Sequence, residues 1–145
     1  KMLLQQNNCV LKRDEAQLEL LNESKLKQPV WNKLYKKDII KGIHFEKGKY
    51  HEDVFWSFQA IGNARSVSII DYIGYFYWQH GESIMGEKYS LKRLDAVEGK
   101  CNRQEYFRIN FPELENRALV DLWFTCLYHG QAKKRRKSPG LRIFE

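Results

Sequence analysis

The chain has 145 residues, of which 43% are hydrophobic and 14% aromatic, and its net charge is +7. This size and composition fit one folded domain with a hydrophobic core and exclude a disordered chain. No run of about eighteen apolar residues occurs, so we expect no transmembrane helix. The chain turns polar after Leu4, so we expect no signal peptide. Because Lys1 is not a natural start of translation, we expect a piece of a longer protein.

The cysteines and histidines give no metal-binding pattern. The three cysteines are Cys9, Cys101 and Cys126, and no C-x-x-C pair occurs. An odd number of widely spaced cysteines indicates free thiols in a reducing compartment, packed as small apolar residues. The four histidines are scattered along the chain. We therefore expect no structural zinc, which needs ligands at short spacing.

The first half of the chain predicts mainly short elements. Residues 12–27 predict a helix, in which Asp14 and Gln17 have the spacing of a capping box and which Pro29 ends. Residues 30–35 are aromatic and β-branched at their start, and they predict either a short strand or a buried turn.

A brief helix is predicted over residues 36–41, and Gly42 closes it in the manner usual for a helix C-terminus. Residues 44–46 then predict a short strand, and residues 47–49 predict a turn. Another helix is predicted from Glu52, because apolar residues follow at helical spacing.

Gly62 and Asn63 stop this helix, and the clearest strand signal follows. Residues 66–70 are rich in β-branched side chains and residues 72–78 are densely aromatic, so both predict strands whose aromatic side chains lie mostly in the core. Residues 79–84 predict a loop.

Two helices are predicted at the C-terminal end. The first runs from Ser90 to about Phe107, and the second begins with Asn110 as its cap and Pro112 in its first turn. The second helix has an apolar stripe wide enough to pack against the first. That stripe consists of Leu114, Ala118, Leu119, Leu122, Cys126 and Leu127.

Together these elements predict an α+β fold, with a short mixed sheet and a C-terminal helical layer. Residues 1–130 form the predicted domain and residues 131–145 a basic tail. Only two to four short strands are visible, without an N-terminal βαβ series to pair with. Because open sheet edges are normally avoided, we expect a missing N-terminal half to supply partner strands.

The basic residues are concentrated in the tail. Its fifteen residues contain six Lys or Arg and one acidic residue, Glu145, and so carry +5 of the net +7. Three interpretations of the run 133–137 stay open. It is a solvated tail, it binds an anionic membrane surface, or it binds nucleic acid, which is least favoured because nothing else looks like a base-reading module.

Two adjacent carboxylates, Glu52 and Asp53, stand where a Gly-containing loop leads into the helix predicted from residue 52. Free backbone N–H groups and the helix dipole hold an ionised carboxylate in place there. A positioned carboxylate can act as a general base. The alternative interpretation is a plain helix cap, since acidic residues are favoured at that position anyway.

Several motifs occur in a fixed order, and together they resemble the C-terminal half of family-2 glycosyltransferases of the GT-A fold. These motifs are W-N-K-L-Y at 31–35, F-x-x-G at 45–48, E-D-V at 52–54, Y-x-Y at 75–77 and S-I at 83–84. The resemblance covers roughly residues 12–130. It implies a partial GT-A fold whose N-terminal nucleotide-binding half, with its D-x-D motif, is missing from this chain.

The resemblance also implies roles for individual residues. Asp53 would deprotonate the acceptor hydroxyl as it attacks the anomeric carbon, and Glu52 would shape the site or bind an acceptor hydroxyl. Asn32 and Lys33 would hydrogen-bond sugar hydroxyls or the donor phosphate. Trp31 would be either a core residue or a stacking platform, whereas its neighbours Leu34 and Tyr35 are expected in the core.

Two further candidates lie after the aromatic strand. His80 would contact a metal or the donor diphosphate, or it is an ordinary surface histidine. Ser83, in the S-I dipeptide, is assigned to substrate binding. Family members often carry Arg near residues 79–80, where this chain has Gln79 and His80, so the residue that reaches the diphosphate stays open.

The implied activity is sugar transfer from a nucleotide-sugar donor to a saccharide or lipid-linked acceptor, by inverting displacement, in polysaccharide biosynthesis of the cell envelope. A divalent metal, Mg or Mn, is expected in the full-length parent, bound mainly by the missing half. The expected location is cytoplasmic, or peripheral at the inner face of the membrane. Two rivals stay open: a non-enzymatic binding module that uses the basic tail on anionic membrane or nucleic acid, and a half-domain that depends on a partner chain.

Overall fold

The computed structural model describes residues 8–76, 78 and 90–137, with the side chains of residues 132–137 left out. The main elements of these residues are β1 (Cys9–Lys12), α1 (Arg13–Asn22), α2 (Glu52–Asn63), β2 (Ser66–Ile69), α3 (Asp95–Asn110) and α4 (Glu115–Lys137). Short 3-10 helices are η1 (Lys37–Ile40), η2 (Leu91–Leu94) and η3 (Pro112–Leu114). The described chain is therefore α+β, as the sequence predicts.

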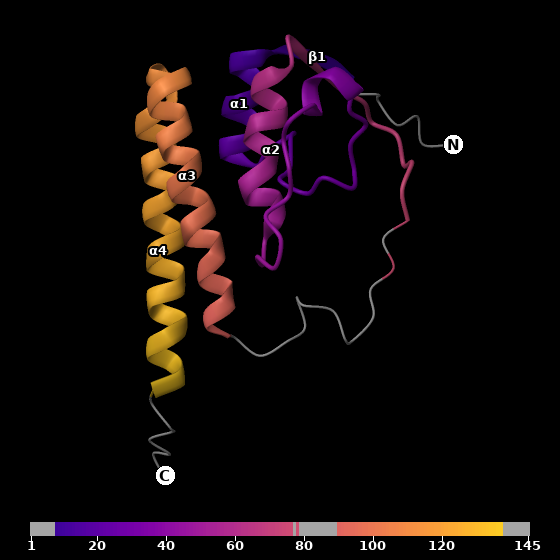
Figure 1. Cartoon of the computed structure of the whole chain (residues 1–145). Coiled ribbons are helices and arrows are strands. Elements are labelled where there is room, and N and C mark those ends of the chain that lie inside the picture. Colours follow the sequence, from indigo (N-terminus) through magenta and orange to yellow (C-terminus); the bar gives the residue numbers. More distant parts are fainter. Residues whose placement is uncertain (1–7, 77, 79–89, 138–145) are drawn as a thin grey trace, which may run out of the picture.

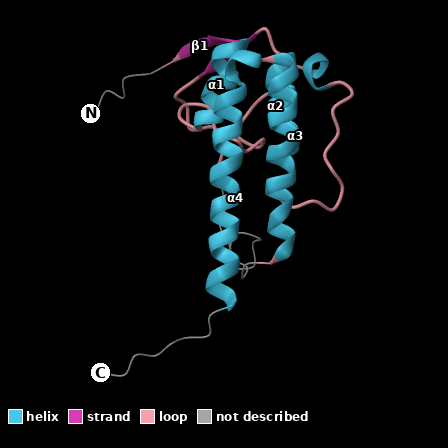
Figure 2. Cartoon of the chain, turned by 90° about the vertical axis from the view of Figure 1, so that its left-hand side faces the viewer, coloured by secondary structure: helices cyan, strands magenta, loops and turns pink. Residues whose placement is uncertain are grey.

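The helices α3 and α4 form a long antiparallel hairpin along one side of the molecule (Figure 1). Helix α3 lies between α4 and α2, and α1 packs against α2. The small sheet sits at the end of the molecule near the start of α1 (Figure 2). In the part of the chain that the structure describes, no helix is both long and apolar enough to cross a bilayer.

The hydrophobic core forms where α1 and α2 meet the end of α3 and the start of α4. Its buried members are Ala16, Leu20, Leu21, Leu26, Phe58, Ile61, Phe107, Phe111 and Ala118. The rings of Phe107 and Phe111 lie 5.5 Å apart across the turn that joins the hairpin. Each large apolar side chain buried here contributes roughly 1.5–3 kcal/mol. The hairpin extends well beyond this cluster (Figure 1).

The sheet is an antiparallel pair in which β1 lies beside β2. Cys9 is paired with Ile69, and Lys12 is paired with Ser66. Leu11, Val67 and Ile69 turn toward the core, whereas Val10 faces solvent. The strand predicted over residues 66–70 is thus confirmed, but the helix predicted from residue 12 is preceded by a strand that local pattern did not predict.

Two other strand predictions are wrong. Residues 44–46 form no strand, and neither do the described residues of the segment 72–78. Five large side chains of this segment are between 53% and 90% exposed, so its described residues are not part of the core: Tyr72, Ile73, Tyr75, Phe76 and Trp78. β-Propensity measures fit to a pleated, packed surface, and the described chain offers these residues no partner strand.

The helix predictions hold with shifted ends. Helix α1 stops at Asn22, because Glu23 adopts a left-handed conformation with φ 47° well before Pro29. The brief helix before Gly42 is the single 3-10 turn η1, and α2 begins and ends where predicted. The helix expected from Ser90 is η2 followed by α3.

Helix α4 begins at Glu115, later than predicted, because the expected cap Asn110 is the last residue of α3 and Pro112 begins η3. The helix is also rotated relative to the predicted stripe. Ala118 is buried against α3, whereas Leu119, Cys126 and Leu127 are exposed. The face toward α3 instead carries Asp121 and the buried His129. Its backbone continues to Lys137, through the first part of the segment expected as a tail.

Buried charges explain this rotation. Arg103 on α3 is only 1% exposed, and its guanidinium pairs with Asp121 of α4. Lys100, at 8% exposed, places its ammonium 2.9 Å from the same carboxylate. Two cations withdrawn from water require this carboxylate, since an unpaired buried charge is strongly destabilising. The attraction turns Asp121 toward α3, so that Leu119, Cys126 and Leu127 of the predicted stripe are left exposed.

We expect Asp121→Asn to lower the free energy of unfolding by roughly 3–5 kcal/mol, because it leaves both buried cations without a carboxylate. Urea denaturation followed by circular dichroism measures the change. Glu105→Gln is the matched control, since it removes the carboxylate of the exposed Glu105–Arg108 pair on the same hairpin. Little change is expected for the control. An unchanged urea midpoint for Asp121→Asn would show that the cluster does not hold α4.

Candidate functional site

The acidic pair lies in the first turn of α2, as predicted. Gly48 with φ 81° forms the turn before it, and His51 adopts a left-handed conformation with φ 58° at the helix start. The amide of Val54 donates to the carbonyl oxygen of His51 at 2.9 Å and closes the first turn. Glu52 is exposed, whereas Asp53 is half-buried. Only Asp53 is thus drawn into the molecule.

The surroundings of Asp53 make its carboxylate more basic than usual. Burial raises the pKa of Asp53 above its ordinary value, and the adjacent charge of Glu52 raises it further. His51 and backbone N–H groups of the helix start oppose this rise. A carboxylate whose pKa is shifted toward neutrality is a better proton acceptor, which is the property that a general base needs.

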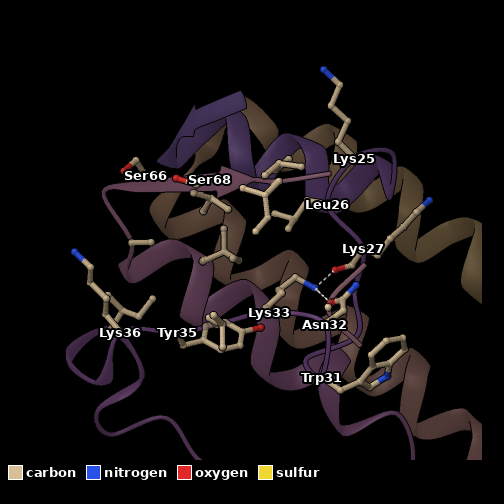
Figure 3. Close-up of a pocket in the computed structure, with 18 of the residues that line it drawn as sticks. Lys25, Leu26, Lys27, Trp31, Asn32, Lys33, Tyr35, Lys36, Ser66 and Ser68 are labelled. Atoms are coloured by element: carbon tan, nitrogen blue, oxygen red, sulfur yellow. Dashed lines mark hydrogen bonds between the residues drawn. The ribbon is translucent and has the colours of Figure 1, made fainter. Parts of the chain in front are cut away.

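Lys33 lies close enough to Asp53 for their charges to interact, but its ammonium is engaged by its own loop. It donates to the carbonyl oxygens of Lys27 at 2.6 Å and Pro29 at 2.5 Å, and to the side-chain oxygen of Asn32 at 2.7 Å. Figure 3 shows the ammonium pointing at Lys27 and Asn32. An ammonium has three protons, so this set uses all of them.

Tyr35 is the other neighbour of Asp53. Its ring packs edge-on against Trp56, with the ring centres 4.9 Å apart. Burial, followed by the charge of Asp53, raises the pKa of Tyr35 to about 12. Its buried hydroxyl has no hydrogen-bond partner among the described residues. Tyr35 is therefore partly buried, whereas Leu34, also expected in the core, is fully exposed.

An open cleft of about 1540 Å³ adjoins these residues. Its lining comes from residues 25–39 on one side and residues 61–75 on the other, and includes Trp31, Asn32, Lys33 and Tyr35. Glu52 and Asp53 are not among the lining residues. Lys33 and Tyr35 both line the cleft, and the charge of Asp53 acts to raise the pKa of each. Both residues therefore border the cleft and lie near the candidate base.

An exposed aromatic pair lies at this cleft. The ring centres of Trp31 and Tyr75 are 4.8 Å apart, with the planes inclined by 30°. Both side chains are about half exposed, so neither is a core residue. The sequence leaves open whether Trp31 is a core residue or a stacking platform, and its exposure favours the platform. The contribution of Tyr75 was missed, because a Y-x-Y pattern in an apparent strand indicates core packing.

A buried glutamine that the sequence did not single out fixes the position of Asp53. The Gln28 amide donates to the Asp53 carbonyl oxygen at 2.7 Å, and its side-chain oxygen accepts from Arg103 at 3.1 Å. The Ser57 hydroxyl donates to the Gln28 carbonyl oxygen at 2.9 Å. Gln28 thus ties the start of α2 to α3. No local pattern marks it, since its partners are 25 to 75 residues away.

The remaining candidates are outside this arrangement. His80 and Ser83 lie outside the described residues, so their predicted roles stay predictions. In the described ranges 8–76, 78 and 90–137, no group of three or more His, Cys, Asp or Glu side chains gathers as a metal site. The described cysteines are all free thiols, with Cys101 and Cys126 exposed rather than packed.

No family model, no curated protein and no solved structure matches this chain.

The buried ammonium of Lys33 predicts a pH dependence of stability. Burial lowers the pKa of Lys33 from 10.5 to about 8, so between these pH values the unfolded chain binds more protons than the folded one. Lys33 therefore makes the free energy of unfolding increase as the pH rises from about 8 to 10.5. We expect a gain of roughly 1–3 kcal/mol, since a tenfold change in proton affinity corresponds to about 1.4 kcal/mol.

Urea denaturation of the unaltered chain and of Lys33→Met between pH 7.5 and 10.5 measures this gain. The difference between the two proteins should change across the interval, because only the unaltered chain has the ammonium. Lys36→Met, at an exposed lysine, is the control and should follow the unaltered chain. Parallel pH profiles for Lys33→Met and the unaltered chain would contradict a buried ammonium.

Proposed function

We propose that this chain is the acceptor-side part of a nucleotide-sugar-dependent glycosyltransferase of the GT-A type, with Asp53 as the catalytic base. The observation that carries the proposal is the position of Asp53. Its carboxylate is half-buried at the start of α2, has a raised pKa, and lies beside two residues of the W-N-K-L-Y segment, Lys33 and Tyr35. Those two segments also carry the family resemblance.

The proposed reaction is a single displacement. An acceptor hydroxyl attacks the anomeric carbon of the donor sugar as its proton passes to the Asp53 carboxylate. A new carbon–oxygen bond forms while the bond to the nucleotide diphosphate breaks, and the diphosphate keeps that electron pair. The configuration at the anomeric carbon is inverted. A sugar hydroxyl is a weak nucleophile until its proton has an acceptor, which the base supplies.

The cleft supplies groups suited to an acceptor saccharide. Trp31 and Tyr75 offer an exposed aromatic surface for the apolar face of a sugar ring. The Asn32 side chain lines the same cleft. Lys33 acts mainly by holding the loop, because a phosphate or hydroxyl would have to displace one of its three carbonyl-type partners.

In the proposed enzyme, the donor diphosphate and a divalent Mg or Mn ion would bind mainly to the donor-binding half. The described residues bring together no cluster of acidic and imidazole ligands, so they do not fit such a metal. Its ligands would come mainly from the donor-binding half. The proposed acceptor is a saccharide or lipid-linked oligosaccharide of the cell envelope, encountered at the cytoplasmic face of the membrane.

The test compares Asp53→Asn with the unaltered sequence in the longer protein that carries the donor-binding half. With a UDP- or GDP-sugar and a divalent metal, we expect Asp53→Asn to bind the donor normally but to lower kcat by roughly 10²–10⁴-fold, the usual contribution of a general base. Asp14→Asn changes an exposed carboxylate on α1, away from the residues that line the cleft. It is the matched control, with kcat expected to stay unchanged.

Two results would contradict the proposal. One is near-normal turnover by Asp53→Asn, which would leave Asp53 as a helix cap. The other is the lack of any nucleotide-sugar binding by the longer protein. The 145-residue chain alone is expected to show no turnover, so nucleotide-sugar turnover by this chain would contradict the assignment of donor binding to another part of the protein.

A further inference from the structure

Helix α4 has an unusual distribution of side chains. Its face toward α3 is polar in the middle, with Asp121, Thr125 and the buried His129. Its opposite face is apolar, and each of its six large side chains is between 40% and 65% exposed. We call these six residues the α4 outer face: Leu119, Val120, Trp123, Phe124, Leu127 and Tyr128.

The α4 outer face is continuous. Residues three and four apart on a helix lie on the same side, so Leu119, Trp123 and Leu127 form one row. Val120, Phe124 and Tyr128 form a neighbouring row. The rings of Trp123 and Phe124 are in contact, with their centres 5.3 Å apart. Contiguous exposed apolar surface of this kind marks an interaction site.

No described element covers this face. Helix α4 stands at the outer side of the hairpin, with α3 behind it and α1 beside its first turns (Figures 1 and 2). The charges of Arg103 and Lys100 fix this orientation, since they hold Asp121 inward. The helix therefore cannot turn its apolar face to the protein without burying two unpaired cations.

The charges along α4 indicate the chemistry of the partner. From residue 116 to residue 137 the only acidic residue is Asp121, and it is used inward by Arg103. Arg117 and the five consecutive basic residues 133–137 belong to the same helix. The partner's surface is thus expected to be anionic near the C-terminal end of the helix and to accept apolar and aromatic side chains.

We propose that α4 binds the surface of an anionic phospholipid bilayer, with its outer face inserted among the upper acyl chains and residues 133–137 at the headgroups. Trp and Tyr favour the boundary between lipid and water. An amphipathic helix with large apolar residues on one face and Lys and Arg nearby is typical of in-plane membrane binding. This inference does not depend on the proposed glycosyltransferase activity, since it rests on other residues.

A lipid surface fits better than a second copy of the chain. A parallel pairing of two outer faces would bring two runs of five basic residues side by side, and like charges repel. An antiparallel pairing would leave both runs without an anionic partner. An anionic bilayer covers the apolar face and neutralises the basic run at once.

Sedimentation with vesicles tests the proposal on the full 145-residue chain. We expect binding to vesicles of 70% phosphatidylcholine and 30% phosphatidylglycerol at least about 10-fold tighter than to pure phosphatidylcholine. The double variant Trp123→Ser/Phe124→Ser should lose about 10-fold or more in affinity for the anionic vesicles. Phe76→Ser/Trp78→Ser is the matched control, since it removes an exposed aromatic pair outside α4, and it should bind normally.

Fluorescence supplies a second readout of insertion. Brominated lipids quench an indole that enters the acyl region, so quenching should occur on binding and should fall sharply in Trp123→Phe, which keeps the aromatic face. Circular dichroism of each variant shows whether the fold is retained. Because the replaced side chains are exposed, we expect unchanged spectra.

Three outcomes would overturn the proposal. Full vesicle binding by Trp123→Ser/Phe124→Ser, with loss only when residues 133–137 are made neutral, would show that the basic run acts alone. A dimer in solution that this double variant dissociates, without vesicle binding by the unaltered chain, would assign the face to a second copy. Equal binding to neutral and anionic vesicles would show that charge plays no part.

Discussion

Arg103 and Asp121 form the contact on which the arrangement of the helices depends. The guanidinium is almost completely withdrawn from water, and its partners come from two distant parts of the chain, Asp121 and Gln28. A buried cation needs its hydrogen-bonding and ionic partners, because losing one leaves a charge that neither water nor protein solvates. Helix α4 is therefore fixed about its axis at residue 121. Its rotation, and with it the exposure of the α4 outer face, follows from that one requirement.

The same cluster reaches the candidate site through Gln28. This side chain accepts from Arg103 and donates to the backbone carbonyl of Asp53, so the start of α2 is tied to the hairpin. A site built on the first turn of a helix is positioned as firmly as that helix. The carboxylate of Asp53, whose pKa is raised by burial, belongs to the residue held by this contact. The catalytic proposal and the stability of the hairpin thus share a contact.

The surroundings of Lys33 change the role that its residue type suggests. A lysine beside an aromatic residue at the edge of a cleft is a reasonable ligand for phosphate or sugar. In the structure, the Lys33 ammonium instead donates hydrogen bonds to Lys27, Pro29 and Asn32 of its own loop. These bonds stabilise the loop from which Trp31 and Asn32 line the cleft. In the proposed enzyme, the contribution of Lys33 to acceptor binding would be mainly indirect, since the loop it holds carries the exposed ring of Trp31.

The sequence by itself determined the α+β class, helix α2 from Glu52, strand β2 and the acidic pair at a helix start, because each depends on local pattern and turn chemistry. Only the tertiary structure decided four other features. These are strand β1, the absence of a strand in the described part of 72–78, the rotation of α4 and the role of Gln28. Strand pairing and buried charge depend on partners far away in the chain. The approach of Lys33 and Tyr35 to Asp53 is of the same kind: the sequence places them about twenty residues from Asp53, and only folding brings the three side chains near one another.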